Sequence, residues 1–214
     1  MNSGGKDSAS AWWWASCRGW EISQIVTVKV EGDDSHMFQI PGVEISKIQA
    51  NIAGVPYHEV KVTGQENLEV YELKQQIAEL QIDGLVVGAL RSDYQKSRLE
   101  RMTEELGIHI WTPLWHQNGE HHVRQMIENS FSIMISGVSC DGLDDSWLGR
   151  ILNLNDFEQL KNLSEEYRFH IDGEGGEYET IVLDGPHLLQ KINIKYEQHW
   201  DGKRGSIKIL EYST

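Results

Sequence analysis

The chain opens with a run of small and charged side chains able to do chemistry, SGGKDS at positions 3–8. The paired glycines lack a Cβ, so the backbone can approach an anion, and the amides of a helix that starts here would face it. Lys6 adds positive charge. Asp7 would repel a phosphate unless a divalent cation lay between them, which predicts Mg²⁺ held by Asp7. A glycine turn capped by serines is the structural alternative.

This turn lacks the G-x-x-x-x-G-K-[ST] spacing of a Walker loop, so ATP cleavage between the β and γ phosphates is not indicated. It resembles instead the S-G-G-x-D-S pyrophosphate loop of enzymes that cleave ATP between the α and β phosphates and form adenylates. Only Met1 and Asn2 precede the turn, although such a turn usually follows a buried strand.

A second group of polar residues lies in GALRSDYQKSRLE, Gly88–Glu100. The sequence predicts a helix that starts near Ser92, with Ser92 and Asp93 at its N-terminus and Lys96 spaced to pair with Asp93. Three arginines are spaced to serve an anionic ligand or a neighbouring acid: Arg91, Arg98 and Arg101. The alternative is a solvated helical face.

A third group lies in DGEGGEYETIVLDGP, Asp172–Pro186, where four carboxylates crowd around three glycines. The carboxylates are those of Asp172, Glu174, Glu177 and Glu179. Like charges on a tight loop repel one another unless a cation or a cationic substrate offsets them. The segment therefore predicts a cation-binding loop, with a structural glycine turn as the alternative.

The composition disfavours several other kinds of site. The formal net charge of −14 opposes binding along a nucleic-acid backbone and favours a protein partner or a cationic substrate. Cys17 and Cys140 are too few for a disulfide scaffold and are predicted to be buried or inert thiols. The adjacent histidines His121 and His122 lack an i, i+4 arrangement, so a histidine metal cluster is not favoured. Without a long apolar run or a signal peptide, a cytoplasmic location is expected.

Strands alternate with helices over residues 1–118, a pattern typical of parallel strands joined by crossover helices. The expected strands are residues 22–30, 57–62, 85–90 and 108–115, and the expected helices are 8–18, 43–53, 68–80 and 92–106, with a loop at 33–40. Ligands of such sheets bind at the carboxyl ends of the strands, so the turn at 3–8 and residues 91–95 should share one edge.

After residue 118 the pattern changes. Helices are expected at 121–130 and 157–167, strands at 132–139 and 180–183, and antiparallel structure from Lys191 around the turn Asp201-Gly202. The expected fold is therefore α/β, with a Rossmann-like parallel sheet and flanking helices at residues 1–118, followed by a smaller α+β domain at residues 119–214.

Five segments together resemble the diphthine-ammonia ligase family: residues 3–8, GALRSDYQKSRLE, PLW at 113–115, GLDDSWLGR at 142–150 and EGGEYETIVLDGP at 174–186. The resemblance implies an adenine nucleotide alpha-hydrolase-like first domain with a strand before the turn. It also implies amidation of diphthine, the modified histidine of translation elongation factor 2. ATP, Mg²⁺ and ammonium are implied as well, with an acyl-adenylate as the intermediate and AMP and pyrophosphate as products.

The resemblance also implies roles for individual residues. The cofactor-binding residues would be Ser3, Gly4, Gly5, Lys6, Asp7, Ser8, Gly88, Ser92 and Arg98. The catalytic residues would be Lys6, Asp7, Asp93, Glu174, Glu177 and Glu179. Lys6 would stabilise charge on pyrophosphate, and Asp7 would hold Mg²⁺ directly or through water. Ser92, Asp93 and Arg98 would complete the nucleotide side or orient the acyl group. The three glutamates would bind ammonium, help to deprotonate it, or meet the trimethylammonium group of diphthine. Aromatic partners for that group would be Trp115, Trp147 and Tyr178.

Two alternatives stay open from the sequence. One is another ATP-pyrophosphatase ligase, such as a tRNA-modifying enzyme, although the absence of CxxC pairs and the acidic charge balance count against it. The other is a nucleotide-binding module without catalysis. The sequence also leaves a homodimer open.

Overall fold

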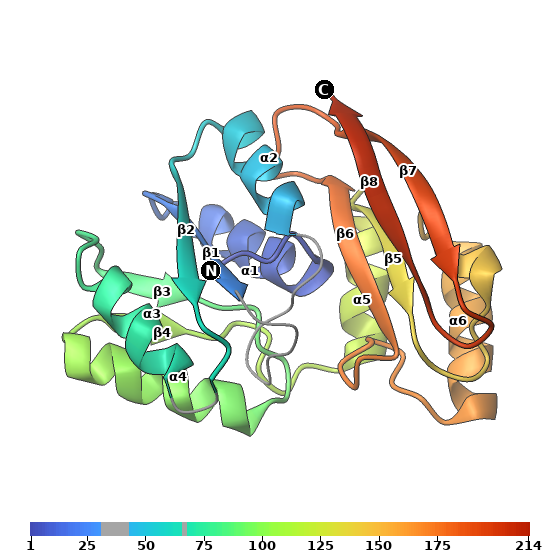
Figure 1. The fold of residues 1–214 in the computed structure, drawn as a ribbon, viewed down its shortest axis with the longest axis horizontal. Helices are drawn as coiled ribbons and strands as arrows, with labels where there is room; N and C mark the ends of the chain where they lie inside the picture. Colours follow the sequence, from blue (N-terminus) through green and yellow to red (C-terminus); the bar gives the residue numbers. More distant parts are fainter. Residues whose placement is uncertain (31–42, 66–67) are drawn as a thin grey trace. The chain divides into compact units, whose positions relative to one another are not determined.

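The computed structural model describes residues 1–30, 43–65 and 68–214, which form two compact units, Met1–His116 and Gln117–Thr214 (Figure 1). The loop predicted at residues 33–40 lies outside the described residues. Among the described helices, none is both long enough and apolar enough to cross a membrane.

The first unit alternates helices and strands as predicted. Its elements are α1 (Lys6–Cys17), β1 (Ile25–Val30), α2 (Val43–Ala53), β2 (Tyr57–Val62), α3 (Glu69–Ile77), β3 (Gly84–Val86), α4 (Asp93–Leu106) and β4 (His109–Trp111). β1 pairs with β2 in parallel, with Ile25 opposite Tyr57, and β3 pairs with β4 in parallel, with Gly84 opposite His109. The predicted α/β class with parallel strands is confirmed.

The two parallel strand pairs are joined by the first two residues of the chain. The amino group of Met1 donates to the carbonyl of Val86 at 2.6 Å, and the amide of Asn2 donates to the carbonyl of Val26 at 2.8 Å. Met1 and Asn2 therefore lie between β1 and β3. The turn at residues 3–8 consequently follows a segment that lies between two strands of the unit, the position expected of a phosphate-binding turn.

A cavity of about 610 Å³ adjoins Met1 and Asn2 in this unit. Its walls are the segments at residues 20–26 and 81–86, together with the indoles of Trp12 and Trp111. These segments hold the amino ends of β1 and β3, whereas the turn at residues 3–8 follows Asn2 in the direction of the carboxyl ends. The cavity is therefore not the predicted ligand edge.

β3 is shorter than the predicted strand at residues 85–90. The amide of Val87 still donates to the carbonyl of Trp111 at 2.9 Å, but the next residue, Gly88, packs against the main chain at the start of α1. The backbone at Gly88 cannot both continue the pairing of β3 with β4 and pack against the main chain of α1. The apolar run therefore leaves the sheet two residues after Val86.

Strands and helices both contribute side chains to the core of the first unit. Branched side chains on the strands alternate inward, and α3 and α4 pack against each other and contribute one apolar side each. The buried set is Val26, Val28, Val30, Val60, Val62, Leu73, Ile77, Leu85, Leu99 and Met102. This core holds the strand ends that carry the site.

The second unit is α+β, as predicted. Its elements are α5 (Gly119–Glu128), β5 (Ser132–Val138), η1 (Asp145–Trp147), α6 (Leu154–Tyr167), β6 (Tyr178–Asp184), β7 (Asn193–Trp200) and β8 (Gly205–Ser213). The four strands form one antiparallel sheet in the order β6-β5-β8-β7, and α5 packs against α6. The predicted turn at Asp201-Gly202 joins β7 to β8, with the Asp201 side chain accepting from the amides of Lys203 and Arg204.

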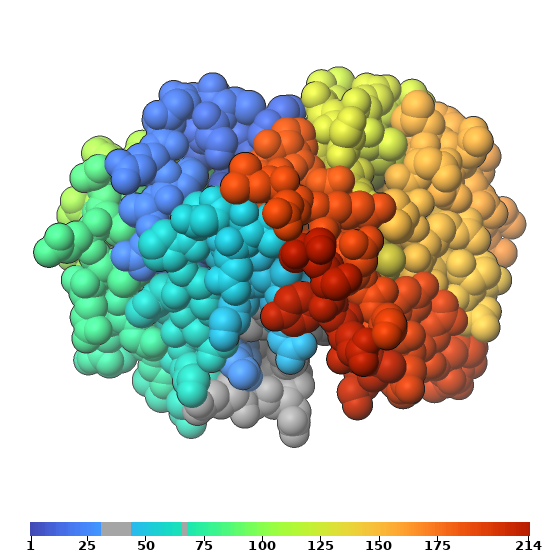
Figure 2. All heavy atoms as spheres, turned by 90° about the horizontal axis from the view of Figure 1, so that it is seen from above, coloured from blue at the N-terminus to red at the C-terminus, as the bar shows by residue number. Residues whose placement is uncertain are grey.

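β7 and β8 meet the rest of the sheet over a short stretch. β8 pairs with β5 at Gly205 and Ser206, and β7 and the rest of β8 form a ribbon with many exposed side chains. Figure 2 shows this orange-to-red segment on the molecular surface. Leu210 and Tyr212 are among the exposed residues.

His187 should make the stability of the protein depend on pH. Burial lowers its pKa from 6.5 to about 4, and its ring stacks on Phe131 at 5.5 Å. Between those values the unfolded chain binds the proton more readily, so the free energy of unfolding should fall by about 3 kcal/mol as the pH drops from 6.5 to 4. Unfolding curves of wild type and His187→Phe across this range test it. Equal pH slopes would contradict the expectation.

Candidate active site

The turn at residues 3–8 has the backbone shape of an anion-binding site. Gly4 has φ +88°, a backbone conformation that residues with a side chain rarely adopt, and Gly5 is the N-cap of α1 in an extended conformation. Because Gly5 has no side chain, it cannot fold back over the amides that open α1. The helix dipole and these amides together favour an anion at this point.

The two serines of the turn are tied to each other. The amide of Ser3 donates to the Ser8 hydroxyl at 3.2 Å, and the two hydroxyls lie 3.3 Å apart. The Ser8 hydroxyl also donates toward Asn2 Oδ1 at 2.7 Å. These contacts close the turn around its glycines and hold Ser8 inside.

Lys6 and Asp7 form an ion pair at the start of α1. Lys6 Nζ lies 2.7 Å from Asp7 Oδ2, and Lys6 is only 4% exposed, while the Asp7 side chain is 25% exposed. A buried cation beside amides suits a phosphate. One partly exposed carboxylate also fits Mg²⁺, which proteins usually hold through one or two carboxylates together with substrate phosphates. Among the described residues no cluster of three or more metal-ligating side chains is present.

Gly88 lies directly against this turn. A Cβ placed on Gly88 would come within 2.5 Å of the Asp7 carbonyl oxygen and 2.8 Å of the Ser8 nitrogen. The chain that follows β3 therefore touches the first turn of α1. The sequence predicted the turn and residues 91–95 at one edge of the sheet. The contact that the structure shows is that of Gly88, three residues before Arg91, with Asp7, and the sharing of one edge by residues 91–95 stays a prediction.

Ser92, Asp93 and Arg98 lie on α4. Ser92 is its N-cap and accepts from the amide of Gln95 at 3.3 Å. Arg98 stacks on the ring of Tyr94 at 3.4 Å and donates to the Tyr94 carbonyl at 3.3 Å. The predicted pairing of Lys96 with Asp93 is wrong, because Lys96 pairs with Glu100 one helical turn further on.

Glu177 turns into its own loop in the second unit. Its carboxylate accepts from the amide of His170 at 2.9 Å and from the amide of Gly175 at 2.8 Å. The Tyr178 hydroxyl closes the same loop by donating to the Ile171 carbonyl at 2.6 Å. The Glu177 side chain thus organises the loop backbone. Its role toward a cation stays a prediction, as do the roles of Glu174 and Glu179, both partly exposed.

Cys140 lies close enough to this acidic loop to be affected by its charge. Burial raises the pKa of the thiol to about 11, with the negative charges of Glu177 and Asp141 adding to the effect. A thiol of this kind stays protonated at neutral pH and is a poor nucleophile. The prediction of an inert Cys140 agrees with this environment.

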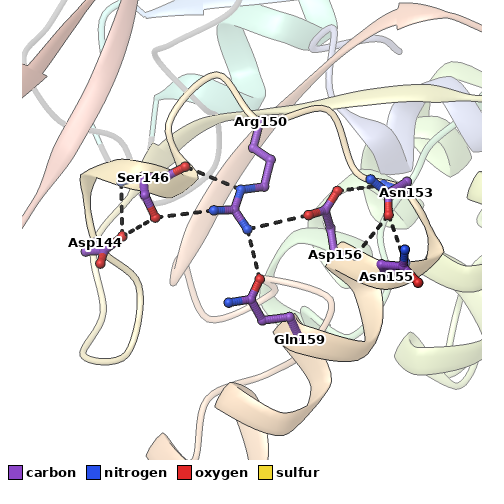
Figure 3. Close-up of polar contacts among 7 residues, drawn as sticks. All are labelled: Asp144, Ser146, Arg150, Asn153, Asn155, Asp156 and Gln159. Atoms are coloured by element: carbon purple, nitrogen blue, oxygen red, sulfur yellow. Dashed lines mark hydrogen bonds and ion pairs between the residues drawn. The ribbon is translucent and has the colours of Figure 1, made fainter.

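The segment GLDDSWLGR is fastened by Arg150 (Figure 3). The guanidinium donates to the carbonyl and hydroxyl of Ser146 and to Gln159 at 3.0 Å, and it pairs with Asp156 at 3.5 Å. Arg150 therefore ties the loop to the start of α6. The guanidinium also covers the ring of Trp147 at 4.2 Å.

Two of the three aromatic candidates for a quaternary ammonium group are core residues. Trp147 is 2% exposed and lies under Arg150, and Tyr178 is 3% exposed with its hydroxyl bound to the loop. Buried rings cannot receive a ligand, so the prediction for these two residues is wrong. Trp115 is partly exposed, with Lys96 Nζ 5.0 Å from its ring centre.

Sequence reasoning missed a set of polar residues beneath the turn. They are buried side chains with hydrogen bonds to one another or to the turn: Asn2, Thr27, Ser46 and Gln49. Ser46 and Gln49 are spaced i, i+3 on α2, next to the buried Ile45 and Ile48. Polar residues spaced like core residues on a helix were the available signal.

Glu177→Gln should loosen the acidic loop. The new amide offers one acceptor and one donor group where two backbone amides donate, so one amide of the loop loses its partner. The free energy of unfolding should fall by about 1–2 kcal/mol. Urea unfolding beside Glu166→Gln, which removes an exposed charge from α6, measures the effect. Equal midpoints for the two variants would show that Glu177 does not organise the loop.

Family models and related proteins both match this chain over most of its length. Residues 1–110 match the family model described as Diphthamide synthase N-terminal domain, and residues 118–214 match Diphthamide synthase C-terminal domain. A human protein named diphthine–ammonia ligase is 33% identical, over 89% of this chain and 79% of the human one. The bovine protein of the same name is 32% identical over the same shares.

More distant relatives include a Schizosaccharomyces pombe protein with the same name, 26% identical over 98% of this chain and 38% of its own. Among solved structures, a predicted subunit of tRNA methyltransferase from Methanocaldococcus jannaschii has a TM-score of 0.45 and 14% identity, over 89% of this chain and 96% of that chain. A similarity this low assigns no function.

Proposed function

Because the chain belongs to the diphthamide synthase family, we propose that it is the ligase that converts the carboxylate of diphthine on translation elongation factor 2 into an amide, using ATP and ammonium. The observation that carries the proposal is the turn at residues 3–8. It combines glycine backbone, a buried Lys6 and the start of α1 in one anion-binding shape.

The reaction needs activation because a carboxylate is a poor electrophile. A carboxylate oxygen of diphthine attacks the α-phosphorus of ATP, and the bond to pyrophosphate breaks. Ammonium loses one proton to solvent, and the resulting ammonia attacks the acyl carbon. The carbon–oxygen bond to AMP then breaks, and a second proton leaves the nitrogen for solvent. The products are the amide, AMP and pyrophosphate.

The first unit supports the ATP half of this scheme. The amides that open α1 and the ammonium of Lys6 would hold the β and γ phosphates and stabilise the charge that develops on pyrophosphate. Asp7 would hold Mg²⁺, which supplies charge neutralisation at the phosphates when bound. Gly88 keeps the chain after β3 in contact with Asp7, and Ser92, Asp93 and Arg98 are proposed to complete the nucleotide side.

The second unit supports the part of the scheme that involves the cationic groups, ammonium and the trimethylammonium group of diphthine. Its acidic loop would offer Glu174 and Glu179 to ammonium or to the trimethylammonium group of diphthine, with Glu177 shaping the loop between them. The net charge of −14 suits cationic substrates. Elongation factor 2 is the proposed partner, and the cytoplasm the proposed location.

One assay tests the proposal. The protein is incubated with diphthine-bearing elongation factor 2, ammonium, Mg²⁺ and ATP, and nucleotides and the modified residue are analysed. We expect AMP, pyrophosphate and one amide per AMP. AMP release stimulated by free tRNA without amide would favour a tRNA-modifying ligase instead. ATP binding without turnover would favour a binding module, and formation of ADP would contradict the scheme.

A further inference from the structure

We infer that Asn2 and Gln49 are positioning residues, which fix the main chain of the turn at residues 3–8 in its phosphate-binding shape. The inference rests on the proposed nucleotide site and concerns which residues build it. Asn2 is 4% exposed and Gln49 is fully buried, and neither contains a group suited to the chemistry itself.

Asn2 binds the turn from below. Its Oδ1 accepts from the amide of Gly4 at 3.1 Å and from the hydroxyl of Ser8 at 2.7 Å. One side-chain oxygen thus joins the glycine with positive φ to the helix that follows it. If the amide of Gly4 turned outward, Asn2 Oδ1 would lose the hydrogen bond that it accepts from this amide.

Gln49 binds the opposite groups. Its Oε1 accepts from Asn2 Nδ2 at 2.8 Å, and its Nε2 donates to the carbonyl of Gly4 at 3.2 Å. Together the two amide side chains engage both the N–H and the C=O of Gly4. The peptide groups on either side of Gly4 are therefore fixed in orientation.

The direction of each side-chain amide follows from its partners. A carbonyl accepts but cannot donate, so Gln49 must present Nε2 to Gly4 and Oε1 to Asn2. Asn2 must then present Nδ2 to Gln49 and Oδ1 to the two donors of the turn. Neither amide can flip without opposing two acceptors or two donors.

Two hydroxyls anchor the main chain of Asn2 to the rest of the unit. Thr27 Oγ1 on β1 donates to the carbonyl of Asn2 at 2.8 Å and lies 2.6 Å from Ser46 Oγ on α2, which also reaches that carbonyl at 3.2 Å. β1 and α2 thus hold Asn2 from two directions. Apolar side chains at these positions would fill the space but would leave the turn without these fixed contacts.

The test uses pyrophosphate as the probe, because it reports on the turn whether or not the ligase reaction occurs. Gln49→Met keeps the size of the side chain and removes its hydrogen bonds to Asn2 and Gly4. We expect the Kd for pyrophosphate with Mg²⁺, measured by calorimetry, to rise at least 10-fold, with the KM for ATP rising in parallel. Adenosine affinity should change less than 3-fold, because adenosine has no phosphate.

A control and a second pair of variants keep the result interpretable. Thr103→Val removes a buried hydroxyl that bonds only carbonyls of its own helix α4, among the hydrogen bonds described, and should leave pyrophosphate binding unchanged. If Gln49→Met does not fold, Thr27→Val and Thr27→Ser decide. The valine should weaken pyrophosphate binding several-fold, and the serine, which keeps the hydroxyl, should restore it.

Three results would overturn the inference. The first is a folded Gln49→Met with wild-type pyrophosphate affinity. The second is equal pyrophosphate affinity in the two Thr27 variants. The third is a wild-type protein that binds no pyrophosphate, since the turn would then not be a phosphate site. If the wild-type protein binds pyrophosphate but forms no amide in the ligase assay, the proposed reaction is contradicted and the positioning role is not.

Discussion

Replacing Lys6 by methionine should lower kcat/KM for ATP in the ligase assay by about 10²–10³-fold, the loss typical when a preorganised charge-stabilising group is removed. Lys6 Nζ is buried at the start of α1, where negative charge on the departing pyrophosphate would collect. A buried ammonium acts more strongly than one in water, because little solvent screens it.

The neighbouring carboxylate provides the control. Lys6→Met leaves Asp7 without the 2.7 Å ion pair, so part of the effect could come from Asp7. The double variant Lys6→Met/Asp7→Asn removes the Asp7 charge as well. If pyrophosphate stabilisation by Lys6 is the cause, the double variant stays at least 10²-fold impaired. Recovery to within 3-fold of wild type would assign the loss to Asp7 instead.

Gly88→Val should disable the nucleotide site and destabilise the first unit. A Cβ at Gly88 would lie 2.5 Å from the Asp7 carbonyl oxygen, which belongs to backbone and cannot swing away as a side chain could. Either β3 or α1 must move. We expect kcat/KM for ATP to fall by about 10²-fold, and the free energy of unfolding by about 1–3 kcal/mol.

Gly107→Ala is the matched control for this variant. Gly107 ends α4 with φ +69°, and an added Cβ there meets no described atom within 4 Å. Alanine should therefore cost about 1 kcal/mol through backbone strain, while the ligase rate per folded molecule stays unchanged. A Gly88→Val protein with wild-type ligase kinetics would show that this contact does not shape the site.

The sequence predicted the arrangement of elements well where the pattern was local. The branched run at residues 22–30 and the cap at Ser92 carry their own signals. The strand forms over Ile25–Val30 of that run, and α4 begins directly after Ser92 as expected. The end of β3 could not be predicted in this way. The run LVVGAL stays apolar to Leu90, and what ends the strand is the contact of Gly88 with Asp7, a partner 81 positions away in the chain.

The candidate site was predictable in its residue types but not in its contacts. Glu177 has the carboxylate expected of a cation ligand, yet each of its two oxygens accepts a hydrogen bond from a loop amide. Trp147 was a candidate aromatic partner of the ligand, although large aromatic residues more often lie in the core, and its burial under Arg150 places it in the core. Gln49 looked like an ordinary helix residue because its partners, Asn2 and Gly4, lie 47 and 45 positions away.

The fate of the diphthine carboxylate oxygens tests the central claim most directly. Elongation factor 2 carrying diphthine labelled with ¹⁸O in both carboxylate oxygens is converted with ATP, Mg²⁺ and ammonium, and the products are analysed by mass spectrometry. Attack on the α-phosphorus predicts one ¹⁸O in AMP and one in the amide. Unlabelled AMP, or ¹⁸O in inorganic phosphate released with ADP, would contradict it.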